Sequence, residues 1–215
     1  MRQSKLLSVI LATITAVFLL TVSTAFPILL RPFYYAHITP LALEQTSGLN
    51  REQIVTAYDE MMDFCTGRTS EFSTGVLPWS VSGRDHFADV RGLFLLDLGT
   101  AAIAGLLLLG WTLAGKAGRV RPYRFRKRSF AFWGCVGLGG FFLTIAAFTA
   151  ADFRRAFLLF HRVFFPGKSN WVFNPYTDGI ICILPQVFFR NCAILILITM
   201  VLLCTAIILW DLRKQ

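Results

Sequence analysis

The sequence predicts an all-α integral membrane protein with four transmembrane helices. Of its 215 residues, 55% are hydrophobic and only 15% are charged, whereas about a quarter of the residues in soluble domains are charged. Four apolar runs exceed the roughly 18 residues that indicate a spanning helix. A globular core of this size could not bury all four, so we interpret 1–215 as a single transmembrane domain. The spans are approximately 6–30, 92–115, 130–151 and 188–210.

The first apolar run begins like a secretory signal, because MRQSK is basic and VSTA resembles a cleavage site. Its apolar stretch is about 25 residues long, whereas the apolar core of a signal peptide is roughly 7–15 residues. We therefore expect an uncleaved membrane anchor.

The connection between the second and third spans predicts the orientation. This loop, 116–129, contains KAGRVRPYRFRKR, which has basic residues from Lys116 and Arg119 onward and no acid. Both chain ends are basic as well. Because basic residues mark the cytoplasmic ends of spans, we expect both termini and this loop to be cytoplasmic. Contact with anionic lipid explains the loop more simply than nucleic-acid binding does. The longer segments 31–91 and 152–187 then form an extracytoplasmic cap with short helices.

The first outer segment contains a predicted amphipathic helix, NREQIVTAYDEMMDFC. Asn50 is a good N-cap, and Gln53 stands at the capping-box position. The apolar residues of this helix recur on one face, which we expect to pack on the membrane face or on the spans. They are Ile54, Tyr58, Met61, Met62 and Cys65.

The stretch RDHFADVRGLFLLDLG enters the second span with no helix breaker before Gly92. We therefore expect it to form the outer end of that helix. At about 100° per residue, His86, Asp89 and Asp97 lie near one face. Because a charged group facing lipid is costly, this face is predicted to contact protein.

The third span could also continue outward through ADFRRAFLLFHRVFF. His161 lies at the edge of a Phe stripe in this stretch, and the helix should end near Pro166. The following GKSNWVFNPYTDG is predicted to be loop, with Asn174 and Pro175 as turn formers.

All three histidines lie in the outer segments, where imidazole could transfer protons near neutral pH. We interpret His37 as an interfacial histidine. His86 has Asp89 as an orienting partner at i+3, and for both His86 and His161 a structural role is an equal alternative. Ser80 and Ser82 precede His86 without any local nucleophile pattern.

The polar residues near these histidines each have two interpretations. Asp89 and Asp178 could orient a histidine or hold a substrate ammonium, or they could pair with arginines. Asn170, Asn174 and Trp171 carry donors that could stabilise an oxyanion, or they could form turns and anchor the interface. The histidines and aspartates lack tight metal-site spacing. Of five cysteines, Cys65 and Cys182 lie in the outer segments and could form a disulfide.

Several blocks of the chain resemble a known family. FYYAHITPLAL, NREQIVTAYDEMMDF, WSVSGRDHFADVR, DFRRAFLLFHRVFF and NWVFNPYTDGIICILPQVFF follow in the order typical of the four-span bacterial membrane family DUF1461. That family includes the lipoprotein intramolecular transacylases of Gram-positive bacteria. The resemblance covers nearly the whole chain outside the cytoplasmic loop.

The resemblance implies transfer of the sn-2 acyl chain of a diacylglyceryl-cysteine lipoprotein to the α-amino group of the same cysteine. His86 would be the general base oriented by Asp89, and His161 the general acid or oxyanion donor. The exchanged assignment of the two roles is the alternative. A headgroup pocket would be formed by Arg91, Asn170, Trp171, Asn174, Asp178 and Tyr35.

We expect no cofactor or metal. The expected partners are the diacylated lipoprotein N-terminus and membrane lipids, with the protein acting as a monomer in the bacterial cell membrane and its site on the extracytoplasmic face. Two alternatives stay open. One is a non-catalytic module that binds envelope lipids or a membrane partner, and the other is a metal-dependent membrane hydrolase.

Overall fold

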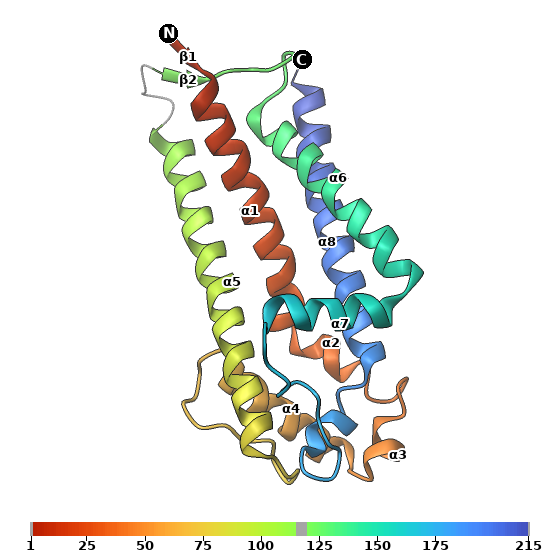
Figure 1. Cartoon of the computed structure of the whole chain (residues 1–215). Helices are drawn as coiled ribbons and strands as arrows, with labels where there is room; N and C mark the ends of the chain where they lie inside the picture. Colours follow the sequence, from red (N-terminus) through yellow and green to blue (C-terminus); the bar gives the residue numbers. More distant parts are fainter. Residues whose placement is uncertain (1, 115–119, 215) are drawn as a thin grey trace. The chain divides into compact units, whose positions relative to one another are not determined.

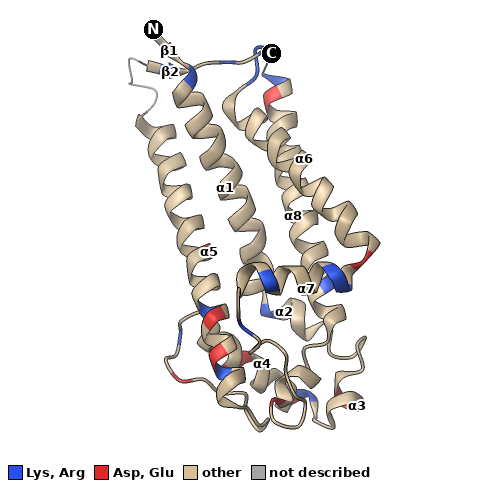
Figure 2. Ribbon diagram, in the orientation of Figure 1, with Lys and Arg blue, Asp and Glu red and all other residues tan. Residues whose placement is uncertain are grey.

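Four long helices dominate the computed structural model, which describes residues 2–114 and 120–214. Each helix is long and apolar enough to cross a membrane, which confirms the four-span fold. In Figure 2, long stretches of these helices are tan, the colour of residues other than Lys, Arg, Asp and Glu. The helices are α1 (Lys5–Leu29), α5 (Val81–Ala114), α6 (Phe130–Ala151) and α8 (Gln186–Arg213), labelled in Figure 1.

The chain divides into two compact units. Unit 1 comprises the described residues within 1–25, 97–151 and 195–215, and unit 2 comprises 26–96 and 152–194. Each unit is therefore assembled from separate parts of the sequence, and α1, α5 and α8 each contribute residues to both. Every residue predicted for the site lies in unit 2.

Contacts in unit 1 bring both chain ends to the loop between α5 and α6 (Figure 1). Strand β1 (Arg2–Ser4) pairs in parallel with β2 (Val120–Pro122). The Asp211 carboxylate near the end of α8 accepts a hydrogen bond from the Ser129 backbone at 3.2 Å and lies 3.7 Å from Arg128. Both ends thus meet at this loop, and the side of the membrane that they face stays a prediction. Lys116 and Arg119 of the loop lie outside the described residues.

The long helices of unit 1 approach closely at a glycine. A Cβ placed on Gly134 of α6 would lie 2.7 Å from the Ala12 carbonyl oxygen of α1. Small residues allow such approach between membrane helices. Around this contact, a buried cluster comprises Leu19, Cys135, Leu138, Met200 and Cys204.

Unit 2 contains the short helices that the sequence predicted for the outer segments. The longest of those before α5 is α4, whose Asn50 and Gln53 form the predicted capping box. All five apolar residues predicted on its inner face are buried. The short helices are α2 (Arg31–Tyr35), α3 (Leu43–Ser47), α4 (Arg51–Cys65), α7 (Phe153–Phe164) and the 3-10 helix η1 (Gly179–Cys182).

Tyr34 links the parts of unit 2 that are distant in sequence. Its ring stacks on Tyr58 of α4 at a centroid distance of 3.7 Å. Its hydroxyl donates to the Ile183 carbonyl at 2.9 Å. Burial raises the pKa of Tyr34, so the hydroxyl stays protonated and remains a donor.

The predicted outward extension of the second span is confirmed, because α5 begins at Val81 and includes His86. The expected continuation of the third span is wrong. The helix α6 ends at Ala151, and the backbone of Asp152 is extended. The Asp152 side chain accepts a hydrogen bond from the Arg155 backbone, so Asp152 is the N-cap of α7. This N-cap aspartate therefore separates two helices where the sequence pattern predicted one continuous helix. The end of α7 at Phe164 agrees with the prediction.

Candidate active site

The structure brings His86 and His161 together in unit 2. Their rings stack with centroids 6.0 Å apart and an interplanar angle of 27°. His86 comes from the first turns of α5 and His161 from the last turn of α7. Both side chains are buried, with 5% and 8% of their surface exposed. Two histidines that are 75 positions apart in the sequence therefore form one pair.

Aromatic rings enclose the histidine pair. His86 contacts Phe165 at 4.9 Å and Phe173 at 5.4 Å, as ring-centroid distances. His161 contacts Phe157 at 4.4 Å and Trp171 at 4.8 Å. Rings in place of water disfavour the charged imidazolium of either residue, because a charge loses hydration when it is buried.

One hydrogen bond fixes the tautomer of His161. Its Nδ1 lies 2.8 Å from the Phe157 carbonyl oxygen. A carbonyl only accepts, so Nδ1 carries the proton, and the neutral ring presents the lone pair of Nε2. Burial lowers the pKa of His161 below its usual 6.5, and the bond to Phe157 offsets part of that shift. His161 is therefore neutral at pH 7 and able to accept a proton.

Asp89 does not make the orienting contact that the spacing suggested. Its carboxylate accepts hydrogen bonds from Lys168 Nζ at 2.6 Å and from Asn170 Nδ2 at 3.1 Å. The Nδ1 atom of His86 is buried without a hydrogen-bond partner in the described part of the chain. The loop after α7 supplies the Lys168 ammonium, and an ion pair between this cation and the carboxylate is stronger than a hydrogen bond from a neutral ring.

The bond to Asp89 also fixes the orientation of the Asn170 amide. A carboxylate only accepts, so the NH₂ group of Asn170 faces Asp89. The remaining atom, Oδ1, is buried and has no hydrogen-bond partner among the described residues. Asn170 thus presents an acceptor to its surroundings. One of its two N–H donors is engaged with Asp89, so donation to an oxyanion stays a prediction that rests on the second N–H.

Trp171 is engaged in the same way. Its Nε1–H donates to the Lys168 carbonyl at 3.0 Å within the loop, so this N–H is not free to bind an oxyanion. Its ring lies against His161 and separates that imidazole from water. The structure therefore gives Trp171 a role in burying His161.

Asp178 connects the loop to the start of α5. Its carboxylate is occupied by hydrogen bonds from Ser80 and Thr177. It is 5% exposed, and its Oδ1 accepts from the Ser80 backbone at 2.9 Å and the Ser80 hydroxyl at 2.7 Å. Burial alone would raise the pKa of Asp178, but hydrogen bonds from Ser80 and Thr177 outweigh it and lower the pKa. Ser80 in turn accepts from the Gly83 backbone at 3.0 Å, so it caps α5.

The other residues predicted for a headgroup pocket hold the chain in place. Arg91 donates to the carbonyls of Phe64 and Thr69 after α4. The Asn174 side chain accepts from the Tyr176 backbone at 3.0 Å and forms a turn. The Tyr35 hydroxyl donates to the Asp59 carboxylate at 2.6 Å. Arg91, Asn174 and Tyr35 thus each have a structural partner, and their place in a headgroup pocket stays a prediction.

The described residues contain neither a disulfide between Cys65 and Cys182 nor a cluster of metal ligands. Cys65 and Cys182 are both free thiols. No group of three or more His, Cys, Asp or Glu residues within 2–114 and 120–214 is placed to hold a metal ion. His37 bonds the Phe33 carbonyl at 2.6 Å, in agreement with its interpretation as a structural histidine.

Three residues of the site were missed in the sequence. Lys168 pairs with Asp89, and Phe165 and Phe173 lie against His86. The sequence offered one signal for them, since all three fall in the polar and aromatic loop that follows His161. Their partners on α5 could not be inferred, because a loop has no periodicity from which to read a direction.

Comparisons with known proteins agree on one family. The family model for the lipoprotein intramolecular transacylase Lit matches residues 9–189. No curated protein sequence matches the chain. The structure of the membrane integral lipoprotein intramolecular transacylase from Bacillus cereus is 22% identical, has a TM-score of 0.83, and covers 97% of this chain and 95% of its own.

Two further structures of the Bacillus cereus protein carry a substitution of one histidine. The form with arginine in place of that histidine is 21% identical, has a TM-score of 0.78, and covers 97% of this chain and 92% of its own. The form with alanine is 22% identical, has a TM-score of 0.72, and covers 97% and 93%. At these identities the structures establish a shared fold.

Proposed function

Because the chain belongs to the lipoprotein intramolecular transacylase family, we propose that it moves the sn-2 acyl chain of a diacylglyceryl-cysteine lipoprotein to the α-amino group of the same cysteine. The observation that carries this proposal is the buried pair of His86 and His161 rings, 6.0 Å apart. Two imidazoles at this distance can remove one proton and supply another within a single reacting group. The product is an N-acyl lyso-lipoprotein.

His161 is the better candidate for the base. Its Nδ1–H is held by the Phe157 carbonyl, so Nε2 has the free lone pair that a base needs. This assignment exchanges the two roles first expected from the spacing of His86 and Asp89. His86 then acts as the acid, or binds the oxyanion through a ring N–H.

The reaction needs no covalent intermediate with the protein. The amine nitrogen forms a bond to the acyl carbon, the ester C–O bond breaks, and the amine proton passes through the histidines to the glyceryl oxygen. Amine and ester belong to one molecule, so holding that molecule in place supplies a high effective concentration. The free Oδ1 of Asn170 accepts an N–H of the amine, and this bond aligns the nitrogen for attack.

The membrane orientation follows from the same proposal. The basic loop and the two chain ends would face the cytoplasm, and the segments that carry the histidines would face the outer leaflet, where a processed lipoprotein exposes its lipidated cysteine. One chain holds the complete histidine pair, so a monomer suffices.

The test is lipoprotein modification in a bacterial host that lacks N-acyltransferase activity, measured by mass spectrometry of the N-terminal lipopeptide. Expression of the wild type should yield the N-acyl lyso form. His161→Ala and His86→Ala should each reduce the rate by about 10²–10⁴-fold, as expected for lost acid–base catalysis. Asn170→Leu should raise KM, because the amine loses its acceptor.

His37→Ala is the matched control and should leave the rate unchanged, because the His37 ring bonds the Phe33 carbonyl of the preceding helix α2. Full N-acylation by either His86→Ala or His161→Ala would show that the pair does not carry the reaction.

A further inference from the structure

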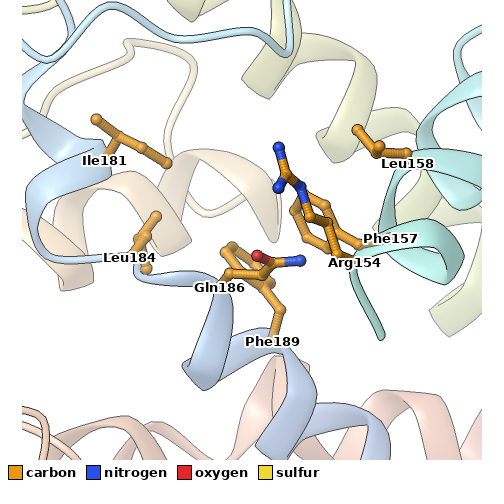
Figure 3. Close-up of a pocket in the computed structure, with 7 residues that line it drawn as sticks. All are labelled: Arg154, Phe157, Leu158, Ile181, Leu184, Gln186 and Phe189. Atoms are coloured by element: carbon orange, nitrogen blue, oxygen red, sulfur yellow. The ribbon is translucent and has the colours of Figure 1, made fainter. Parts of the chain in front are cut away.

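A cavity of about 200 Å³ in unit 2 has no part in the proton transfers. Its walls are apolar side chains from α7, from η1 and the residues after it, and from the first turn of α8 (Figure 3). The apolar lining consists of Phe157, Leu158, Ile181, Leu184 and Phe189. Phe157 is shared with the site, since its ring also lies 4.4 Å from the His161 ring.

Two polar side chains enter this apolar cavity. In Figure 3 the Arg154 guanidinium and the Gln186 amide both point into the space that the apolar side chains enclose. Arg154 forms no hydrogen bond or ion pair with the described residues. Its neighbour Arg155, by contrast, is paired with Asp152 at 3.1 Å. Arg154 is thus a cation with five free donors at the edge of an apolar space.

The lining defines the chemistry of the ligand. Arginine has donors and no acceptor, so the ligand must offer oxygen acceptors. The apolar walls require hydrocarbon next to that oxygen. The volume lies below the roughly 300–1,000 Å³ of pockets that enclose a whole small molecule. An ester carbonyl followed by the first methylenes of an acyl chain, with the rest of the chain in lipid, satisfies all three conditions.

The position of Phe157 indicates which ester binds there. Its ring lines the cavity and contacts the His161 ring, whereas His161 does not line the cavity. An ester held by Arg154 would therefore not contact the base. A diacylglyceryl group carries two esters on adjacent carbons, which are separated by about the thickness of one side chain. We propose that the cavity binds the ester of the retained sn-1 chain, through Arg154 and Gln186, while the sn-2 ester lies at the histidine pair.

This inference rests on the proposed function, and it makes Arg154 a residue that binds the substrate's second ester. The test compares two lipopeptides in detergent micelles. One carries ester-linked chains at sn-1 and sn-2, and the other has an ether in place of the sn-1 ester. Both keep the transferable sn-2 ester. They differ only in the sn-1 carbonyl, to which Arg154 is proposed to donate a hydrogen bond.

The wild type should bind the diester with a KM about tenfold lower than the ether lipopeptide, and with similar kcat. A charge-assisted hydrogen bond has roughly this effect. Arg154→Gln should abolish the preference by weakening only the diester. Arg155→Gln is the matched control and should keep the preference, because Arg155 is paired with Asp152. Thermal unfolding of each variant verifies that it is folded.

Binding measured with the His161→Ala variant separates this proposal from the proposed function. If the wild type transfers no acyl chain, the function fails, yet a diester preference in Kd would still support the cavity assignment. Equal weakening of both lipopeptides by Arg154→Gln would overturn it. So would a preference that survives Arg154→Gln, or competition at Arg154 by phosphatidylglycerol without any ester preference, which would assign the cavity to a phospholipid.

Discussion

At the scale of single residues, one backbone carbonyl determines what His161 can do. The Phe157 oxygen holds the proton on Nδ1, while the surrounding rings keep water away from the imidazole. The same imidazole in an exposed loop would exchange tautomers and would be partly charged near its usual pKa. Burial thus converts a common side chain into a neutral base whose free nitrogen is defined.

The lowered pKa of His161 predicts the acid limb of the pH profile. The reaction requires neutral His161, whose pKa is lowered from the ordinary 6.5, so the limb of kcat/KM that belongs to His161 should lie below pH 6.5. The substrate ammonium adds a separate limb at roughly 7.7–8.0. Trp171→Ala exposes the ring to water and should shift the His161 limb upward toward 6.5. His37→Ala should leave it in place. NMR titration of the His161 ring separates the two limbs, and a wild-type midpoint for this ring at or above pH 6.5 would contradict the assignment.

The lowered pKa of His161 also makes the stability of the protein depend on pH. Because the folded pKa of His161 is depressed, the unfolded chain binds the proton first as pH falls. The free energy of unfolding should therefore be highest above pH 6.5 and should decrease below it, until the folded histidine also titrates.

At the scale of elements, the loop of residues 165–178 is attached to α5 at two places. Lys168 and Asn170 bond Asp89, and Asp178 bonds Ser80. Between these attachments the loop places Trp171 on His161 and Phe173 on His86. The loop therefore sets the burial of both histidines.

Gly83 gives a sharp test of the second attachment. A Cβ at Gly83 would lie 2.2 Å from the Asp178 Oδ1 atom, whereas one at Gly92 in the same helix meets nothing within 4 Å. Gly83→Ala should displace Asp178 and cost about 1–3 kcal/mol of unfolding free energy. Gly92→Ala should be neutral or stabilising, because alanine favours helix. Thermal unfolding in detergent measures both, and equal stability of the two variants would refute the close contact.

The elements differ in how much of them could be predicted from the sequence. Long apolar runs define the four spans, and Asn50 with Gln53 defines the start of α4, because both signals are local. The break at Asp152 was missed because one capping residue interrupts an otherwise continuous helical pattern. Its N-cap preference was the available signal.

The site was predictable in its histidines and not in its supporting contacts. Asp89 and Lys168 are 79 positions apart, and Ser80 and Asp178 are 98 apart. A local sequence pattern does not predict which distant donor a carboxylate will accept a hydrogen bond from. For that reason Asp89 was expected to orient His86, and the acceptor character of Asn170 was hidden until its amide partner was known.

At the scale of the whole molecule, charge predicts how the chain is inserted. Both ends meet the basic loop in unit 1, as four crossings require. A C-terminal green fluorescent protein should therefore fluoresce in the cytoplasm, and a C-terminal alkaline phosphatase should be inactive. A phosphatase inserted after Gly48, a surface turn in unit 2, should be active. The reverse pattern would invert the proposed orientation.

The Tyr34 contact has a consequence for biosynthesis. Unit 2 joins residues 26–96 to residues 152–194, and the Tyr34 hydroxyl finds its acceptor only at Ile183. When the first segment leaves the ribosome, its buried tyrosines and α4 face lack the partners that later cover them. In the proposed orientation, His86 is translocated before His161 has been synthesised. The proposed histidine pair can therefore form only once α7 has followed α6 out of the ribosome.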